Sequence, residues 1–327
     1  MSGRIKEEDV TYLRERVPID EVVADYVQLK SAGGGQKKGL CPFHDEKSPS
    51  FHVTPSKGFY HCFGCQASGD VISFLMKMDH LTFTETLERL ADRIGYTLRY
   101  EENSSGPSVP SGMRSRLIAA NAAAATYYQE QLNTSPDAAH GRDLLMKRGF
   151  DKDACKLFGV GFAPDDWDSL TKHLRAQGFT IDELETAGLS KMGQRGPIDR
   201  FRNRLTWPIK DITGDVVGFG CRKLASDEED QGPKYLNTPE TPIYKKSQVL
   251  YGLDVAKKEI AKKRQAVIVE GYTDVMAAHL AGITTAVATC GTAFGADHIR
   301  ILRRLLMDDD AFRGEVIFTF DGDAAGQ

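Results

Sequence analysis

Two short motifs, Cys41-Pro-Phe-His44 and Cys62-Phe-Gly-Cys65, stand near the start of this 327-residue sequence with seventeen residues between them. A two-residue gap lets one tight turn point two ligand atoms at a single ion. Two such turns complete a tetrahedral Cys3His site with no open position. The spacing therefore predicts a structural zinc site bound by Cys41, His44, Cys62 and Cys65, in a small zinc-ribbon domain.

The choice of the fourth ligand rests on the same spacing. His52 and His61 lie between the two motifs and are rival candidates. His44 is preferred because its distance in sequence from Cys41 matches that of the second pair. Gly64 lies inside the second turn and is expected to supply a positive φ angle that such turns often need.

Composition limits the class of protein. Hydrophobic residues make up 41% of the chain, the formal net charge is −4, and the length suggests two to three domains. No global excess of positive charge indicates nucleic-acid binding, so a basic surface would have to be local. No apolar run approaches the roughly 20 residues of a membrane span. Three cysteines outside the motifs have no pairing pattern, which suits a reducing cytoplasm.

The elements around the motifs are predicted from periodicity. Apolar spacing predicts two short helices in 5–30, broken at Val17-Pro18, and further helices at 71–78 and 83–94. Strands are expected at 50–54 and 58–61. Their aromatic and apolar residues permit two interpretations, a small core or an exposed face that stacks on single-stranded bases; these residues are Phe51, Val53, Phe59 and Phe63.

A polar segment at 101–112, which contains Pro and Gly and has no apolar period, is predicted to be a flexible linker. An Ala-rich helix is expected at 113–132. A mixed α and β domain follows, with strands at 205–210 and 216–220.

The last 62 residues alternate between strand and helix patterns. Strands are predicted at 266–269, 285–289 and 316–320, with helices at 274–281 and 297–307. This order implies a parallel sheet whose strands end along one edge. Glu270 and the pair Asp321 and Asp323 follow strands, so we expect them to converge there and bind Mg²⁺ or Mn²⁺. Asp274 is either a fourth oxygen ligand or the N-cap of its helix.

The residues around these motifs resemble a known family. The stretch at 39–51, Gly-Leu-Cys-Pro-Phe-His-Asp-Glu-Lys-Ser-Pro-Ser-Phe, with Phe59-Tyr-His-Cys-Phe-Gly-Cys65 and Gly69-Asp-Val-Ile-Ser-Phe74, closely resembles the zinc domain of bacterial DNA primases. Glu270-Gly-Tyr-Thr-Asp274 and Asp321-Gly-Asp-Ala-Ala-Gly326 resemble the Toprim core of primases and topoisomerases. That resemblance implies catalytic Glu270, Asp321 and Asp323, and divalent-metal binding by Glu270, Asp274, Asp321 and Asp323.

The segment before this core is locally basic. Residues 195–264 hold 15 Lys and Arg against 10 acidic residues. Its arginines at 200, 202 and 204 alternate, so on a strand they would share one face. Residues 211–222, 233–241 and 244–253 resemble the primase polymerase domain, with Cys221 in place of the family's usual Gly. The resemblance implies contacts with template and nucleotide at Arg148, Arg222, Lys234, Tyr235 and Lys246, with Arg202 and Arg204 as weaker candidates.

Together these features predict a multidomain α+β protein. The expected domains are a zinc-binding domain at 1–100, a linker at 101–112, a basic subdomain of the RNA polymerase domain at 113–264 and an incomplete Toprim α/β core at 265–327. Because the family continues beyond the point that matches Gln327, with more of the sheet, further acidic residues and a helicase-binding domain, we expect an N-terminal part of a longer protein.

The resemblance implies a nucleotidyltransferase that makes short RNA primers on single-stranded DNA from ribonucleoside triphosphates during replication. Zn²⁺ would be structural, and Mg²⁺ or Mn²⁺ catalytic. Expected partners are the template, the triphosphates, the replicative helicase through the absent C-terminal domain, and single-strand-binding protein, at a cytoplasmic replication fork with no membrane. The alternatives are a non-catalytic zinc-dependent single-strand-binding module, or another Toprim nuclease or topoisomerase.

Overall fold

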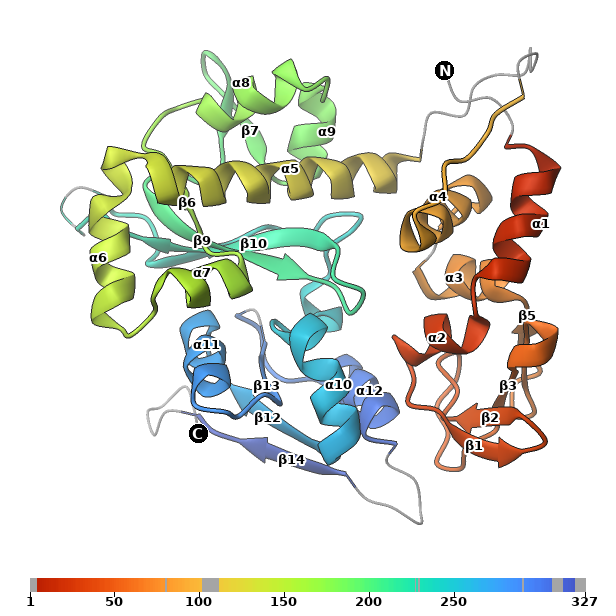
Figure 1. The fold of residues 1–327 in the computed structure, drawn as a ribbon. Coiled ribbons are helices and arrows are strands. Elements are labelled where there is room, and N and C mark those ends of the chain that lie inside the picture. Colours follow the sequence, from red (N-terminus) through yellow and green to blue (C-terminus); the bar gives the residue numbers. More distant parts are fainter. Residues whose placement is uncertain are drawn as a thin grey trace. The chain divides into compact units, whose positions relative to one another are not determined.

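The structure is a computed structural model that describes residues 5–79, 81–101, 112–226, 228, 230–289, 291–307 and 314–320. It divides into two compact units (Figure 1). Unit 1 comprises Met1–Ser115 with Ala261–Arg264 and Ile299–Glu315. Unit 2 comprises Arg116–Ile260, Gln265–His298 and Val316–Gln327. The predicted linker falls largely on residues 102–111, which lie outside the described part of the chain.

Unit 1 is built on an antiparallel sheet in the order β1-β2-β3-β4-β5. Its strands are β1 (Lys30–Gly33), β2 (Gln36–Gly39), β3 (Phe51–Thr54), β4 (Phe59–Cys62) and β5 (Ser68–Gly69). The β1–β2 turn is made by Gly33, Gly34 and Gly35, which all have positive φ. The predicted strands at 50–54 and 58–61 are thus confirmed as β3 and β4.

The helices of unit 1 agree closely with the sequence pattern. They are α1 (Glu7–Arg16), α2 (Ile19–Ala24), α3 (Val71–Asp79) and α4 (Phe83–Ile94). Pro18 separates α1 from α2, as predicted, because proline fits at a helix start and not in a helix interior. A capping box between Thr82 and Glu85 begins α4, and Gly95 at φ 65° ends it.

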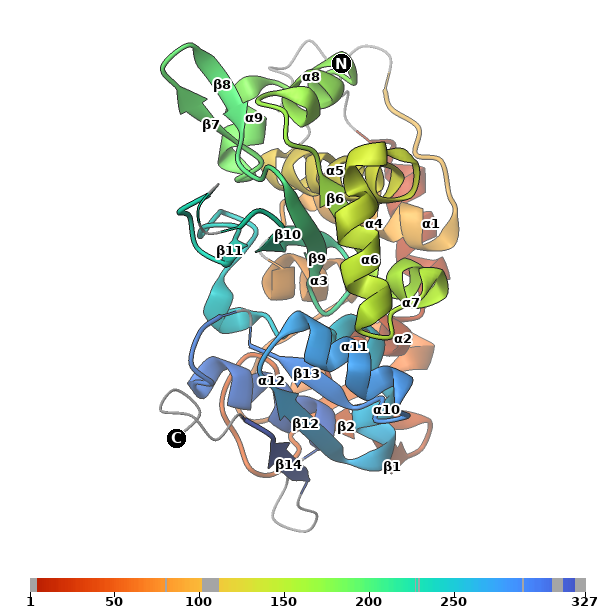
Figure 2. The ribbon, with the colours of Figure 1, turned by 90° about the vertical axis from the view of Figure 1, so that its left-hand side faces the viewer.

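Unit 2 contains an antiparallel sheet in the order β11-β10-β9-β6. Its strands are β6 (Gly161–Ala163), β9 (Arg204–Lys210), β10 (Val216–Lys223) and β11 (Tyr235–Asn237), and a separate hairpin pairs β7 (Ser190–Gly193) with β8 (Gly196–Asp199). Its helices are α5 (Met113–Thr134), α6 (Ala139–Lys147), α7 (Lys152–Phe158), α8 (Ser169–Ala176), α9 (Ile181–Thr186) and α10 (Leu253–Lys263). Figure 2 shows the β7–β8 hairpin beside α8 and α9.

Each face of this sheet has its own core. Phe219 and Cys221 belong to a core shared with α5, α8 and α9. Leu205 and Trp207 belong to a second core shared with α6, α7 and the strands that follow. Because strand residues alternate between faces and both faces are covered, β9 and β10 are buried almost throughout their length.

A parallel sheet follows, in the order β13-β12-β14. Its strands are β12 (Gln265–Val269), β13 (Ala286–Ala288) and β14 (Glu315–Phe318), with helices α11 (Tyr272–Leu280) and α12 (Ala296–Leu306) between them in sequence. The pairing of β12 with β13 is parallel. Main-chain bonds from Glu315 N to Arg264 O and from Thr319 N to Ile268 O keep one register offset, as parallel strands do. The predicted βαβαβ order is confirmed.

Candidate metal centres and nucleic-acid interface

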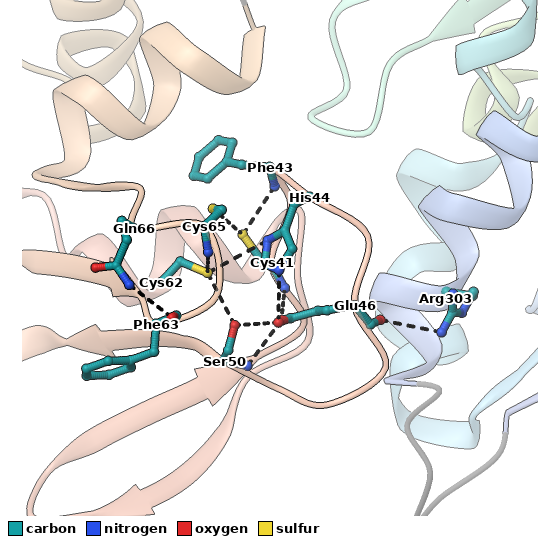
Figure 3. Close-up of polar contacts among 10 residues, drawn as sticks. All are labelled: Cys41, Phe43, His44, Glu46, Ser50, Cys62, Phe63, Cys65, Gln66 and Arg303. Atoms are coloured by element: carbon teal, nitrogen blue, oxygen red, sulfur yellow. Dashed lines mark hydrogen bonds and ion pairs between the residues drawn. The ribbon is translucent and has the colours of Figure 1, made fainter.

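Four side chains of unit 1 meet at one point. Cys41 and His44 come from the loop that follows β2, Cys62 ends β4, and Cys65 lies in the turn before β5. Their ligand atoms all lie within 4.8 Å of one another, and Figure 3 shows them pointing toward a common centre. The structure therefore brings together the four residues that the spacing singled out.

The geometry of this cluster fits a zinc ion. Tetrahedral zinc with sulfur and nitrogen ligands holds its ligand atoms about 3.3–3.8 Å apart. Cys41 Sγ is 3.8 Å from Cys65 Sγ, and Cys62 Sγ is 3.8 Å from His44 Nδ1. Main-chain N–H groups of Phe43 and Cys65 point at the sulfurs of Cys41 and Cys62, each at 3.4 Å. These N–H groups favour the thiolate form that a metal requires.

Gly64 has a different role from the one predicted. Its φ is not in the positive range; Gln66, at φ 62°, takes the left-handed conformation in this turn instead. A Cβ atom on Gly64 would lie 2.6 Å from His44 Nε2 and 3.0 Å from Ser50 Oγ. Glycine is therefore needed here for the close approach of the His44 ring.

The rival histidines lie elsewhere. His52 and His61 are paired across β3 and β4, and both rings contact Phe63 edge-on at 5.1 and 4.6 Å. Lys38 is paired with His52 on the other side. Burial and the Lys38 charge lower the pKa of His52. These residues belong to the outer face of the sheet.

The aromatic residues of the ribbon divide between the two interpretations. Phe51 and Val53 are fully buried, and Phe51 packs with Tyr60 and Phe74 in the core. Phe59 and Phe63 are 42% and 63% exposed. The outer face therefore carries Lys38, His52, His61, Phe59 and Phe63, which we call the ribbon face.

The acidic edge is described only in part. Glu270 directly follows β12 and is exposed, and Asp274 is the third residue of α11. The N-cap of α11 is Gly271 and not Asp274, but Asp274 Oδ2 accepts the Gly271 N–H at 2.9 Å and so caps the helix from within its first turn. Asp321 and Asp323 lie outside the described residues. Because β12 and β14 are parallel neighbours, their C-terminal ends point to the same edge.

Arg222 and Tyr235 form one row on the unit 2 sheet. They are paired across β10 and β11, so their side chains share a face. Two residues along, Gly220 pairs with Asn237 on that same face. Arg222 is partly exposed and its Nε has no hydrogen-bond partner among the described residues, while Tyr235 is 45% exposed.

Tyr272 fixes the start of α11 on this face, a contact that the sequence pattern gave no reason to expect. Its hydroxyl donates to Asn237 Oδ1 at 3.0 Å, and its ring stacks on Trp207 at 5.9 Å. The ring lies so close to Gly220 that a Cβ there would be 2.1 Å from it. The helix that carries Asp274 is thereby packed on the sheet face that carries Arg222 and Tyr235.

Two other predicted cations, Arg148 and Lys234, lie close to this region. Arg148 Nη1 lies 3.5 Å from Thr273 Oγ1, beside Asp274 in the first turn of α11. Lys234 precedes Tyr235 and is exposed. The main chain of Lys246 is held on both sides, because its N–H donates to Glu240 Oε1 at 3.0 Å and its carbonyl lies 3.2 Å from His298 Nε2.

Arg200 and Arg202 do not lie on a strand with Arg204, so the condition for a shared face is not met. The strand begins only at Arg204, and Asn203 has φ 48°. The Arg204 side chain is 6% exposed and donates hydrogen bonds to Asp230 and to the Pro233 carbonyl, so it holds a loop in place. Arg202 instead stacks on the exposed ring of Trp167, with Cζ 3.5 Å from the ring centroid.

Arg200 was passed over as a site residue. It is partly buried, its Nε has no hydrogen-bond partner among the described residues, and burial lowers its pKa. A partly buried guanidinium whose Nε has no hydrogen-bond partner is a better sign of anion binding than the alternation of arginines in the sequence.

Three family models match successive parts of the chain. Residues 5–106 match the CHC2 zinc finger, residues 127–257 match the N-terminal domain of the DNA primase catalytic core, and residues 264–327 match the Toprim domain. Within the described residues, no helix is both long and apolar enough to cross a membrane.

Named proteins show the same similarity. DNA primase of Streptomyces coelicolor is 66% identical over 327 residues, which are 100% of this chain and 50% of that protein. The chain spans about half the length of the curated relatives it matches.

Two crystal structures are similar as well. The RNA polymerase domain of Mycobacterium tuberculosis primase DnaG, in complex with a double-stranded DNA oligomer with a 6-nucleotide overhang, is 61% identical, with a TM-score of 0.62 over 65% of this chain and 66% of that chain. The zinc-binding and RNA polymerase domains of Aquifex aeolicus primase are 32% identical, with a TM-score of 0.59 over 100% of this chain and 74% of that chain.

Proposed function

This chain belongs to the DNA primase family, and we propose that it supplies the template-binding part and the start of the catalytic centre of an enzyme that makes RNA primers on single-stranded DNA. The observation that supports this best is one shared sheet face. Arg222 and Tyr235 project from the face on which Tyr272 packs the helix of Asp274. This packing supports a site in which cationic groups lie near carboxylates, as the transfer of a nucleotide from a triphosphate requires.

The carboxylates suit hard divalent cations. Glu270 and Asp274 offer oxygen ligands at the strand end, and Asp321 and Asp323 would complete the set. A bound Mg²⁺ or Mn²⁺ would supply Lewis-acid activation of the primer 3′-hydroxyl and neutralise charge on the triphosphate. The role of the chain's own residues is to hold the carboxylates in place: Gly271 N–H fixes Asp274, and Tyr272 fixes the helix.

The cations around this edge would bind phosphate. Arg222 offers a planar guanidinium that can bond a phosphate through two N–H groups, and Arg148 stands beside the first turn of α11. Lys234 and Lys246 would contribute point charges. Tyr235 would offer a ring for stacking of a base. Arg204 is not expected to bind phosphate, because its charge is already paired with Asp230.

Two surfaces suit single-stranded template. On unit 2, the Arg202–Trp167 stack leaves an exposed indole, and Arg200 adds a guanidinium without a bonded Nε. On unit 1, the ribbon face combines exposed aromatic rings with Lys38. Stacking rings next to cations are the usual features of sequence-tolerant single-strand binding. Zinc at the Cys3His cluster would be structural and would hold the ribbon together.

Labelled ribonucleotide incorporation on single-stranded DNA, with zinc quantified in the same sample, tests this proposal. We expect template-dependent short RNA, lowered at least tenfold by Arg222→Ala and by Asp321→Asn. Arg175→Ala is the matched control, since Arg175 is exposed on α8, in the layer that packs on the opposite face.

A second candidate function is template binding without catalysis by this chain. The exposed rings of Phe63 and Trp167 favour it, because the stacking of bases on aromatic rings requires no catalytic metal ion. A zinc-loaded chain that binds DNA in a salt-sensitive way and yields no RNA would support this candidate. Failure of Arg222→Ala to lower RNA synthesis would contradict the first candidate, and wild-type DNA binding by a chain with both Phe63→Ala and Trp167→Ala would contradict the second.

A further inference from the structure

Glu46 is a carboxylate whose side chain is only 10% exposed, in the loop between β2 and β3. Its Oε1 accepts the main-chain N–H of Cys41 at 2.7 Å and that of Ser50 at 3.1 Å. Its Oε2 accepts the Ser50 hydroxyl and lies 3.3 Å from His44 Nε2. Figure 3 shows the carboxylate beside the Cys3His cluster.

The His44 ring has two different sides. Nδ1 faces the cluster, 3.8 Å from Cys62 Sγ, and Nε2 faces Glu46. A neutral imidazole carries one proton, and an anion facing Nε2 favours that proton there. The Nδ1 lone pair is then directed at the centre of the cluster, where a metal ligand has to be.

We propose that Glu46 is the positioning residue of this metal site: it selects the His44 tautomer that presents Nδ1 to zinc and fixes the loop that carries two of the ligands. The inference rests on the proposed zinc site and adds a residue outside the Cys3His set. Carboxylates that bond the free nitrogen of a ligating histidine raise its affinity for the metal.

The contacts of Glu46 reach three of the four ligands. It bonds the Cys41 amide directly, faces the His44 ring, and bonds Ser50, whose Oγ is 3.2 Å from Cys62 Sγ. Burying a carboxylate is costly unless it is hydrogen-bonded, and here both oxygens have partners. A carboxylate with no part in the site would not be expected in this place.

Glu46→Gln separates the two roles. The amide keeps an oxygen for the Cys41 and Ser50 N–H groups, but it places an N–H donor opposite His44 Nε2. The neutral ring would then accept at Nε2 and carry its proton on Nδ1, which opposes metal binding. Zinc affinity is measured on the full chain by competition with a chromogenic chelator, together with the rate of zinc release.

We expect Glu46→Gln to bind zinc about 10–100-fold more weakly and to release it faster. Asp45→Asn is the matched control, because Asp45 is an acid in the same loop whose side chain is 67% exposed and pairs with Arg300 at 3.1 Å. In a His44→Ala background, Glu46→Gln should cause little further loss, since its effect passes through that ring.

The outcomes are distinguishable. If the wild-type chain takes up no zinc, the proposed zinc site fails and this inference fails with it. If zinc binds and Glu46→Gln matches the wild type, only the role of Glu46 is overturned. The role of Glu46 is also overturned if Asp45→Asn weakens zinc binding as much as Glu46→Gln does. It is overturned as well if Glu46→Gln causes the same loss of zinc affinity in the His44→Ala chain as in the wild type. The visible spectrum of the Co²⁺-loaded Glu46→Gln chain should approach that of His44→Ala.

Discussion

Among single residues, Glu183 gives unit 2 a specific dependence on pH. Its carboxylate receives two bonds from Arg116, at 2.7 and 2.9 Å, and one from the Thr180 N–H at 2.8 Å. The Arg116 bonds are the largest cause that lowers the pKa of Glu183 to about 2. A folded-state pKa below the unfolded value means that the stabilisation is present above about pH 4.5 and is lost as the pH falls toward 2.

Glu183→Gln should therefore lower the free energy of unfolding by about 2 kcal/mol at pH 7, the usual worth of hydrogen bonds to a charged group. The difference from wild type should shrink as the pH is lowered below 4.5. Urea unfolding followed by tryptophan fluorescence measures it. Glu185→Gln is the control, because Glu185 lies on the same helix and its side chain has no hydrogen bond or ion pair among the described residues; an equal loss there would contradict the assignment to Arg116.

Sequence reasoning succeeded for residues whose partners are local. Two ligands in one turn are visible as a spacing, so the Cys3His set could be predicted. The side chains of Arg202 and Arg204 contact Trp167 and Asp230, which are distant in sequence. No spacing in the sequence predicts these contacts. Glu46 lies within the family motif at 39–51, but its proposed role depends on how the loop folds back on Cys41, which the motif does not show.

Among the elements, the contact of α11 with β10 predicts that adding one methyl group at Gly220 strongly lowers the free energy of unfolding. Gly220→Ala would place a methyl group 2.1 Å from the ring of Tyr272. That ring contacts both Trp207 and Tyr251, so moving it aside would disturb the packing of these rings and cost free energy. We expect a loss of about 2–3 kcal/mol in the free energy of unfolding, typical of overpacking a filled core.

Urea unfolding of unit 2 followed by tryptophan fluorescence measures this change as well. Gly295→Ala is a suitable control, because that glycine has ordinary φ and open space around its Cβ position. A stability within 0.5 kcal/mol of wild type for Gly220→Ala would show that α11 is not fixed to the sheet in this way.

Elements were easier to predict than their contacts. Helical periodicity located α3 and α4 within one residue, and the alternation of strand and helix gave the parallel sheet. β9 begins at Arg204, one residue before the predicted start at 205, and Arg200 and Arg202 lie outside it because Asn203, at φ 48°, interrupts the extended backbone. The packing of Tyr272 on Gly220 joins positions 52 residues apart, which periodicity cannot connect.

For the whole molecule, the two units have separate cores, and this predicts separate responses to zinc removal. Both tryptophans, Trp167 and Trp207, belong to unit 2, whereas the Cys3His cluster belongs to unit 1. A structural zinc contributes directly to folding of the small domain that binds it. Chelation, or Cys62→Ser, should therefore loosen the ribbon and leave the cores around Trp207 intact.

Hydrogen exchange and tryptophan fluorescence distinguish the two units in one sample. After chelation, we expect the amides of β3 and β4 to lose protection by at least tenfold, while the midpoint of urea unfolding reported by tryptophan stays within error of the zinc-loaded chain. Restoring zinc should restore protection. If the tryptophan midpoint falls with zinc, the units fold as one; if β3 and β4 keep their protection without zinc, the aromatic core of Phe51, Tyr60 and Phe74 is sufficient to hold the ribbon, and zinc is not structural.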